Sequence, residues 1–251
     1  MAKVRADQLL VERGLADSRN KAQALILGGS VFSGERRIDK PGQLMAGDVP
    51  LELRGRSLPY VSRGGLKLAH GLDYLDLDPS GMIAIDVGAS TGGFTDVLLQ
   101  RGALRVYAVD VGHGQLDWRL RNDPRVTVLE KTNARHLAHH HVPMPVDLVV
   151  CDASFISLRL VLPASLAMVR PDGWLVALIK PQFEVGKGEV GKGGVVRDED
   201  LHRRVCSEIE TWLSVDLDWT IRGITPSPIL GPKGNREFLV GAQRRSPRSP
   251  T

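Results

Sequence analysis

The sequence predicts an α/β protein in which a larger domain with a mainly parallel sheet follows a small α+β unit. From Gly64 onward, short apolar runs alternate with helical segments, which is the pattern of βαβ units. The runs lie at residues 82–87, 106–109, 126–129, 146–151, 174–179 and 238–240. A glycine-rich turn follows the first run directly, as in sheets that bind a ligand at the carboxyl ends of their strands.

Length, cysteine content and charge narrow the class of protein. The 251 residues allow one typical domain plus a small one. The two cysteines, Cys151 and Cys206, lie far apart without metal-ligand spacing, which is typical of a reduced, cytoplasmic protein. No apolar run approaches the ~20 residues of a membrane span, and the first residues lack a signal-peptide pattern, so we expect no membrane partner. The net charge of +4 permits nucleic-acid binding without establishing it.

Residues 1–53 form the predicted N-terminal unit. A short helix is expected over residues 6–13, and Ser18 caps a second helix that ends at the glycines 28–29. Alternating apolar residues over 49–53 predict a closing strand.

Three basic side chains of this unit, Arg5, Arg19 and Lys21, lie near the N-termini of the two helices. Cations and helix N-termini both attract phosphates. The glycines, cap and strand around these residues resemble the S4 domain, an RNA-binding module. We therefore expect the unit to bind RNA, the alternative being a solvated charged face.

Two further segments complete the domain organisation. Residues 54–62 contain glycine, serine and proline and no acid, which indicates a linker to a catalytic domain at 63–243. Residues 244–251 are rich in arginine, serine and proline, which predicts a disordered tail.

The turn from Asp86 to Thr95 is the predicted cofactor site. Its glycines let a ligand approach the backbone. Asp110 ends the next strand, 22 positions after Gly88, which matches the spacing of an acid that holds a ribose diol. A carboxylate at Asp86 would repel a pyrophosphate, so it favours a ligand with an amino group and a sulfonium over a dinucleotide. A tight turn with no ligand is the remaining alternative.

A second glycine-rich stretch, residues 186–193, nearly matches a phosphate-binding Walker A loop. Gly193 stands where the hydroxyl that binds Mg²⁺ would be needed. We therefore interpret the stretch as a flexible basic loop near the substrate, carrying Lys187 and Lys192, and not as a site of nucleotide hydrolysis.

An acid and a lysine follow two of the predicted strands. Asp152 follows the strand at 146–151 and Lys180 the strand at 174–179, so both are expected on one rim of the sheet. With Lys67 and Glu237 they would suit methylation of a ribose hydroxyl, which needs its proton removed or its developing charge stabilised. The alternative is a set of separate surface ion pairs, which would be favoured for Lys67 or Glu237 taken alone.

Five segments carry a resemblance to a known family. They are residues 60–68 (YVSRGGLKL), 86–95 (DVGASTGGFT), 110–116 (DVGHGQL), 152–158 (DASFISL) and 180–186 (KPQFEVG). In this order they resemble the TlyA family, in which an S4 domain precedes a Rossmann-like methyltransferase of the FtsJ/RrmJ type. The resemblance covers nearly the whole chain.

The resemblance implies a function and a catalytic set. The family uses S-adenosylmethionine to methylate cytidine 2′-hydroxyls of ribosomal RNA, in both ribosomal subunits or in the large one alone. Lys67, Asp152, Lys180 and Glu237 would be its catalytic residues, with Lys180 acting directly on the hydroxyl.

The predicted site residues beyond this catalytic set fall into two groups. The cofactor-binding residues are Asp86, Gly88, Ser90, Gly92, Gly93, Phe94, Asp110, Asn133 and Asp152. The RNA-binding residues are Arg5, Arg19, Lys21, Arg63, Lys187 and Lys192. No metal site is expected, because the histidines at 136 and 139–141 have no acid or cysteine to complete a zinc set.

Two other functions remain open on the sequence. One is an RNA-binding ribosome-assembly factor with an inactive methyltransferase fold, which would bind cofactor without transferring methyl groups. The other is a haemolysin-like activity, a label attached to some members of the family, which the lack of a signal peptide and an apolar span disfavours. Phe155 is open between stacking on a base or on adenine and packing in the core.

Overall fold

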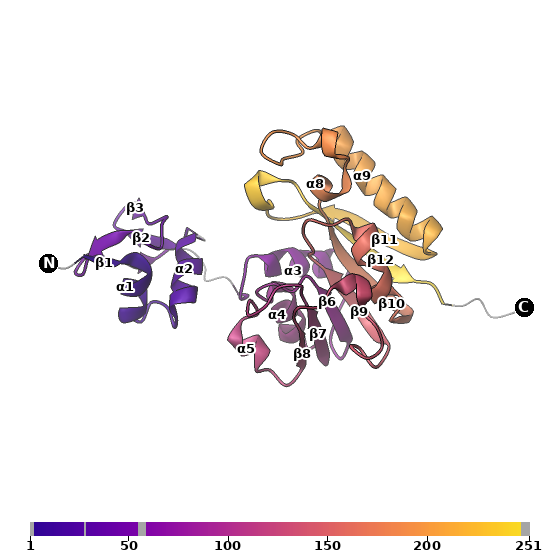
Figure 1. Cartoon of the computed structure of the whole chain (residues 1–251), viewed down its shortest axis with the longest axis horizontal. Coiled ribbons are helices and arrows are strands. Elements are labelled where there is room, and N and C mark those ends of the chain that lie inside the picture. The colour runs from indigo at the N-terminus through magenta and orange to yellow at the C-terminus, as the bar shows by residue number, and fades with distance from the viewer. Residues whose placement is uncertain (1–2, 28, 55–58, 247–251) are drawn as a thin grey trace, which may run out of the picture. The chain divides into compact units, whose positions relative to one another are not determined.

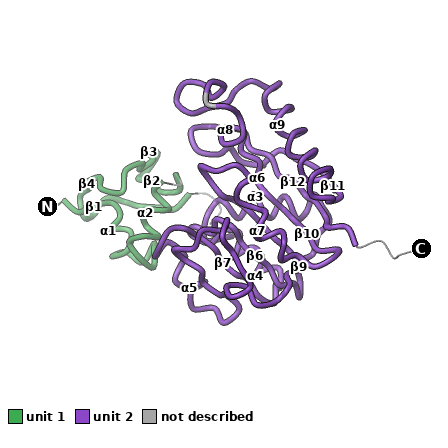
Figure 2. The backbone as a smooth tube through the Cα atoms, turned by 45° about the vertical axis from the view of Figure 1, so that its right-hand side comes forward, with its two compact units in different colours: residues 1–57 green, residues 58–251 purple. Residues whose placement is uncertain are grey.

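The computed structural model describes residues 3–27, 29–54 and 59–246, and the chain divides into two compact units, residues 1–57 and 58–251 (Figure 2). The division lies within the predicted linker at 54–62, of which residues 55–58 are outside the described residues.

The N-terminal unit packs two helices against short strands (Figure 1). Its elements are β1 (Lys3–Arg5), α1 (Ala6–Glu12), α2 (Arg19–Leu27), β2 (Val31–Ser33), β3 (Arg36–Arg37), β4 (Leu44–Ala46) and β5 (Glu52–Leu53). β1 pairs with β4, and β2 pairs with both β3 and β5, all antiparallel. Leu10 of α1 and Ile26 of α2 are fully buried in a shared core.

The predicted second helix is confirmed, with its capping residue. Ser18 Oγ accepts a hydrogen bond from Lys21 N at 3.2 Å, and Gly29 follows the helix at φ +73°. Gly28 lies outside the described residues. The predicted strand at 49–53 is too long, because only Glu52–Leu53 pairs, whereas Val49 N bonds back to Ala46 O in a turn.

The second unit is built on a seven-stranded sheet with the order β11-β12-β10-β9-β6-β7-β8. The strands are β6 (Ile83–Val87), β7 (Arg105–Val109), β8 (Val126–Leu129), β9 (Val146–Cys151), β10 (Val169–Ile179), β11 (Trp219–Pro226) and β12 (Phe238–Arg244). The strands from β10 to β8 pair in parallel, and β12 runs antiparallel to both of its neighbours. The prediction of a mainly parallel sheet is confirmed.

Helices cover both faces of this sheet (Figure 1). They are α3 (Gly64–Tyr74), α4 (Gly93–Gln100), α5 (Trp118–Arg121), α6 (Leu158–Val161), α7 (Pro163–Leu166), α8 (Pro181–Glu184) and α9 (Glu199–Thr211), with shorter turns η1 (Ala134–His136), η2 (Lys187–Glu189), η3 (Trp212–Asp216) and η4 (Pro232–Gly234). Neighbouring strand residues point to opposite faces, so Ala84 packs with Leu72 and Leu98 while Ile85 packs with Ile209.

All six apolar runs form strands, and β11 is a strand that they do not include. Only Trp219 and Thr225 of this strand are buried, because β11 lies at the end of the strand order and pairs with β12 alone. An edge strand with one covered side carries a weak apolar signal.

Asp86 joins the first strand of this sheet to the helix that follows the glycine turn. It is 0% exposed, and its Oδ2 accepts hydrogen bonds from Thr95 N at 3.0 Å and from Thr95 Oγ1 at 2.7 Å. Burial raises the pKa of Asp86 to about 7, the hydrogen bond from Thr95 opposes the rise, and the negative charges of Asp152 and Asp110 add to it.

We predict that ionisation of Asp86 destabilises the fold. An unfolded aspartate has a pKa of about 3.9, so the stability tied to the protonated form is complete below pH ~4 and is lost as the pH rises through about 7. Asp86→Asn should remove this loss, leaving the variant more stable than the wild type at pH 8, by on the order of 4 kcal/mol. Urea unfolding of the ligand-free protein at pH 5 and 8 measures this.

The matched control is Asp78→Asn, which replaces an exposed carboxylate in the turn before β6. It should leave the pH dependence of stability unchanged. Equal pH slopes for wild type and Asp86→Asn would show that the pKa of Asp86 is not raised in the folded state.

Candidate active site

Three strand ends and one helix bring the four predicted catalytic residues together. Asp152 directly follows β9, Lys180 directly follows β10, and Lys67 lies on α3. Glu237 directly precedes β12, and the antiparallel pairing of Ile179 with Phe238 places it at the same edge of the sheet as Lys180.

These residues form a continuous chain of charges, from Glu237 through Lys67 and Asp152 to Lys180. Lys67 Nζ lies 2.6 Å from Glu237 Oε2 and 3.9 Å from Asp152 Oδ2. Lys180 Nζ lies 2.6 Å from the other Asp152 oxygen, Oδ1. The two lysines are 6% and 5% exposed and Glu237 is 2% exposed, so these are not the separate surface ion pairs of the alternative prediction.

Lys180 has further partners. Its Nζ also donates to the carbonyl of Asp152 at 3.1 Å and to Ser154 Oγ at 2.8 Å. A carboxylate and a carbonyl can only accept hydrogen bonds, whereas a hydroxyl can also donate. Ser154 is therefore the one of these three partners that can also donate a hydrogen bond.

The ion pair with Lys67 uses only one of the two carboxylate oxygens of Glu237. The other oxygen, Oε1, is buried and has no hydrogen-bond partner among the described residues. The backbone of Gly231 passes so close to this oxygen that any side chain there would collide with it. Glu237 is thus held in place by packing as well as by Lys67.

Two cavities meet at this rim. One of about 230 Å³ is lined by polar groups that include Lys67 and Lys180, and the other, of about 460 Å³, is lined by residues that include Asp110, Asn133 and Phe155. Both are lined by Gly88, Ser90, Asp152 and Ser154. The shared residues make the Asp152 rim the junction between the cavities.

The glycine turn forms the floor of the junction. Gly88 has φ +81°, and a Cβ there would come within 2.9 Å of Ala153 Cα, so only glycine allows β6 and β9 to end this close together. Gly92, at φ +95°, faces Leu116 and Leu120 and lines neither cavity, whereas Gly93 and Phe94 line the smaller one.

Asp110 borders the larger cavity, as the sequence spacing predicts for a ribose-binding acid. Its carboxylate accepts hydrogen bonds from Ser90 N at 2.8 Å and Gly112 N at 2.7 Å. Asn133 lies on the same cavity and caps η1 by accepting from Arg135 N at 3.1 Å. Asp110 therefore shapes the turn in addition to facing the cavity.

Asp86 was predicted to face the cofactor, but it does not line either cavity. Its side chain instead points under α4 and bonds to Thr95. The predicted direct contact between its charge and a ligand is therefore not found. Asp86 holds the turn from below.

Phe155 does not pack in the core. It is 90% exposed with φ +65°, and its ring centroid lies 5.0 Å from that of Phe183. An exposed aromatic residue in a left-handed backbone conformation is uncommon, and such residues cluster at functional sites. Of the two alternatives for Phe155, the core-packing one is wrong.

The predicted RNA-binding residues lie in different settings. Arg5 and Arg19 both pair with the buried carboxylate of Asp7, at 2.9 and 3.2 Å, and the Arg5 hydrogen bond is the main cause that holds the pKa of Asp7 well below its usual range. Lys21 is half-buried. No sequence pattern points to Asp7, although its carboxylate fixes both guanidinium groups.

The remaining three predicted RNA contacts belong to the second unit. Arg63 is exposed at the smaller cavity, and Lys192 is exposed on the glycine-rich loop. The side chain of Lys187 lies outside the described residues.

Sequence reasoning missed Asn235, which is 3% exposed. Its Oδ1 accepts from Val196 N at 3.1 Å, and its Nδ2 donates to Gly194 O at 3.0 Å and to Pro232 O at 3.2 Å. It therefore fastens the glycine-rich loop to η4, whose Pro232 lines the smaller cavity. The only sequence signal was its place two residues before Glu237.

The described parts of the chain contain no group of three or more histidine, cysteine, aspartate or glutamate residues placed to hold a metal ion. Among the same residues, no helix is both long enough and apolar enough to cross a membrane.

Comparison with known families matches both units. Residues 60–244 match the FtsJ-like methyltransferase family, and residues 4–45 match the S4 domain. The first match covers the sheet, the glycine turn and all four residues of the charged chain.

Individual relatives extend over almost the whole chain. The 16S/23S rRNA (cytidine-2'-O)-methyltransferase TlyA of Mycobacterium tuberculosis is 46% identical over 98% of this chain and 92% of its own length. A Bacillus subtilis protein provisionally named rRNA methyltransferase YqxC is 48% identical over 95% of this chain and 85% of its own length. A solved structure from Streptococcus thermophilus, provisionally named a hemolysin, is 42% identical, with a TM-score of 0.77, and the match covers 98% of this chain and 90% of that one. With an S4 domain followed by an FtsJ-like methyltransferase domain, this chain belongs to the TlyA family.

Proposed function

We propose that this protein is an S-adenosylmethionine-dependent ribosomal RNA (cytidine-2′-O)-methyltransferase that acts in the cytoplasm. The observation that carries the proposal is the chain of Glu237, Lys67, Asp152 and Lys180, in which only Asp152 is partly exposed, at the junction of the two cavities. The name of the M. tuberculosis relative supports the substrate class. The match to the FtsJ-like methyltransferase family supports the cofactor.

The larger cavity fits the nucleoside part of S-adenosylmethionine. Asp110 offers carboxylate oxygens to a ribose diol, and Val109, Val111 and Ile156 supply apolar walls for a base. The smaller cavity, which Gly88, Ser90 and Asp152 also line, leaves room for the rest of the molecule beside Asp152. When bound, the cofactor supplies an electrophilic methyl group.

Lys180 is the proposed group that acts on the 2′-hydroxyl. The oxygen forms a bond to the methyl carbon as the carbon–sulfur bond breaks, and the hydroxyl proton must leave. A neutral Lys180 amine can take this proton, whereas a Lys180 ammonium would instead stabilise the negative charge that develops on the oxygen while the proton passes to solvent. Asp152 and Ser154 fix Nζ at the rim, while Lys67 and Glu237 fix Asp152 from the other side.

The S4 domain is the proposed RNA-binding domain. Arg5 and Arg19, which Asp7 holds at the N-terminal ends of α1 and α2, would meet phosphates together with Lys21. On the catalytic unit, Arg63 and Lys192 would contact the RNA next to the modified nucleotide.

The first test replaces Lys180. Lys180→Ala should lower the single-turnover rate of methyl transfer by ~100-fold or more, within the range of general acid–base groups. Lys180→Arg should be badly impaired if proton removal matters and partly active if positive charge suffices, since arginine does not readily lose its proton. Single-turnover assays with saturating RNA and cofactor measure both variants.

Lys131→Ala, which removes an exposed lysine that lines neither cavity, is the control and should keep the wild-type rate. A near-normal rate for Lys180→Ala would make Lys180 structural, and the assignment of the four-residue set would fail with it.

The second test concerns the cofactor. Titration calorimetry should detect binding of S-adenosylmethionine and none of NAD. Asp110→Ala should weaken binding by roughly tenfold or more, as expected for hydrogen bonds to a charged group. Asp123→Ala, which removes a carboxylate that pairs with Arg125 and lines neither cavity, should bind normally. Preference for NAD over S-adenosylmethionine would overturn the cofactor assignment.

The third test separates RNA binding by the S4 domain from catalysis. Deletion of residues 1–58 should spare cofactor binding and remove most of the affinity for ribosomal RNA. The intact protein should lose RNA affinity as salt rises, because each phosphate contact releases counterions. Filter binding of a ribosomal RNA fragment across a salt series measures both effects, and equal affinity of the truncated and intact proteins would refute RNA binding by the S4 domain.

A further inference from the structure

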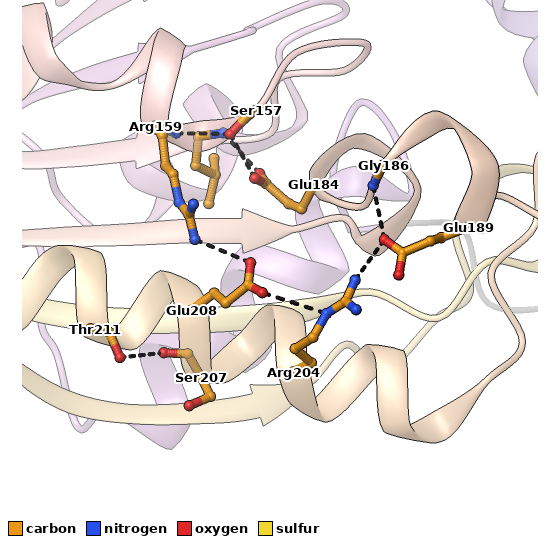
Figure 3. Close-up of polar contacts among 10 residues, drawn as sticks. Ser157, Arg159, Glu184, Gly186, Glu189, Arg204, Ser207, Glu208 and Thr211 are labelled. Atoms are coloured by element: carbon orange, nitrogen blue, oxygen red, sulfur yellow. Dashed lines mark hydrogen bonds and ion pairs between the residues drawn. The ribbon is translucent and has the colours of Figure 1, made fainter.

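A network of polar contacts links three segments around the rim, and α9 supplies its centre (Figure 3). On one side, Glu184 at the end of α8 accepts hydrogen bonds from Ser157 Oγ at 2.6 Å and from Leu158 N at 2.8 Å. Ser157 caps α6, which begins shortly after Phe155. Glu184 thereby joins the segment that follows β10 to the segment that follows β9.

On the other side, α9 reaches both α6 and the glycine-rich loop. Glu208 of α9 accepts from Arg159 of α6 at 3.3 Å, and its second oxygen lies 3.4 Å from Arg204 Nε. Arg204 in turn donates to Glu189 of η2 at 2.6 Å (Figure 3). Glu189 also accepts from Gly186 N at 3.1 Å, so one carboxylate ties the backbone of the loop to α9.

The glycine-rich loop, residues 186–194, is therefore fastened at both ends. Arg204 holds its beginning through Glu189, and Asn235 holds its end through Gly194. A bridge between Gly191 and Val195 closes the segment that carries Lys192. The backbone of this loop, predicted to be flexible, has defined contacts in the structure.

Four of the residues from Gly186 to Gly193 are glycine. Because glycine has more backbone conformations available than other residues, ordering this segment costs more conformational entropy. An exposed ion pair contributes little to stability on its own. Here the Arg204–Glu189 pair favours one arrangement of a segment that could otherwise sample many. Asn235 joins the end of this segment to η4, whose Pro232 lines the smaller cavity.

We propose that Arg204 is a positioning residue for the RNA substrate: through Glu189 it holds the glycine-rich loop in the arrangement that receives the RNA, without contacting RNA itself. The inference rests on the proposed methyltransferase function and deepens it. Arg204 acts on substrate binding, whereas Lys180 acts on the reacting hydroxyl.

Steady-state methylation of a ribosomal RNA fragment tests the proposal. Arg204→Ala and Glu189→Gln should each raise the KM for RNA by roughly fivefold, near the upper end for loss of an exposed ion pair. The kcat at saturating RNA and the affinity for S-adenosylmethionine should stay at wild-type values. Arg203→Ala is the matched control, because Arg203 lies beside Arg204 on α9 and pairs only with Asp200 among the described residues, so it should keep the wild-type KM.

A charge swap distinguishes positioning from direct contact with RNA. Arg204→Glu and Glu189→Arg should each raise the KM when made alone. The double variant should recover part of the loss, because the pair is re-formed in reverse while the hydrogen bond from Gly186 N to Glu189 is not. The salt dependence of RNA affinity should be the same for wild type and Arg204→Ala.

Other results would overturn the inference. They are a wild-type KM in Arg204→Ala and Glu189→Gln, no recovery in the double variant, or a salt slope reduced by about 1 in Arg204→Ala, which indicates a lost phosphate contact. No methyl transfer by the wild-type protein would instead refute the proposed function, so the two failures are distinguishable.

Discussion

The Asp152 carboxylate between two buried lysines is the interaction on which the catalytic unit depends. Each of its oxygens faces one ammonium group, Lys67 on α3 and Lys180 after β10. A buried lysine without a partner would be costly, and removal of one member of such a set strands the others. The positions of α3, β9 and β10 are therefore coupled through a single side chain, and the glycine turn at Gly88 lets β6 end against it.

The parallel part of the sheet could be predicted because its signals are local. Apolar runs separated by helical segments gave the parallel strands, and the rule that ligands bind at strand carboxyl ends placed Asp152 and Lys180 on one rim. The same rule gave Asp110 a place at the larger cavity, where the structure has it.

Other features depend on pairing that no local pattern shows. Glu237 reaches the rim only because β12 runs antiparallel to β10 with Phe238 opposite Ile179, and a strand direction cannot be read from composition. Asp86 was expected to face a ligand, yet strand alternation turns it under α4. The buried carboxylate of Asp7 pairs with both Arg5 and Arg19. The spacing of the three residues in the sequence does not reveal that Asp7 is buried.

The pairing of Lys67 with Glu237 joins residues that are 170 positions apart in the chain. Such a contact closes a very long loop, so it can form only when the intervening strands are in register. During synthesis on the ribosome, a nascent chain would carry Lys67 and Asp152 long before it carries their last partner. The candidate site is therefore complete only in a nearly full-length chain: one cut short before Glu237 would hold Lys67, Asp152 and Lys180 without the carboxylate that pairs with Lys67.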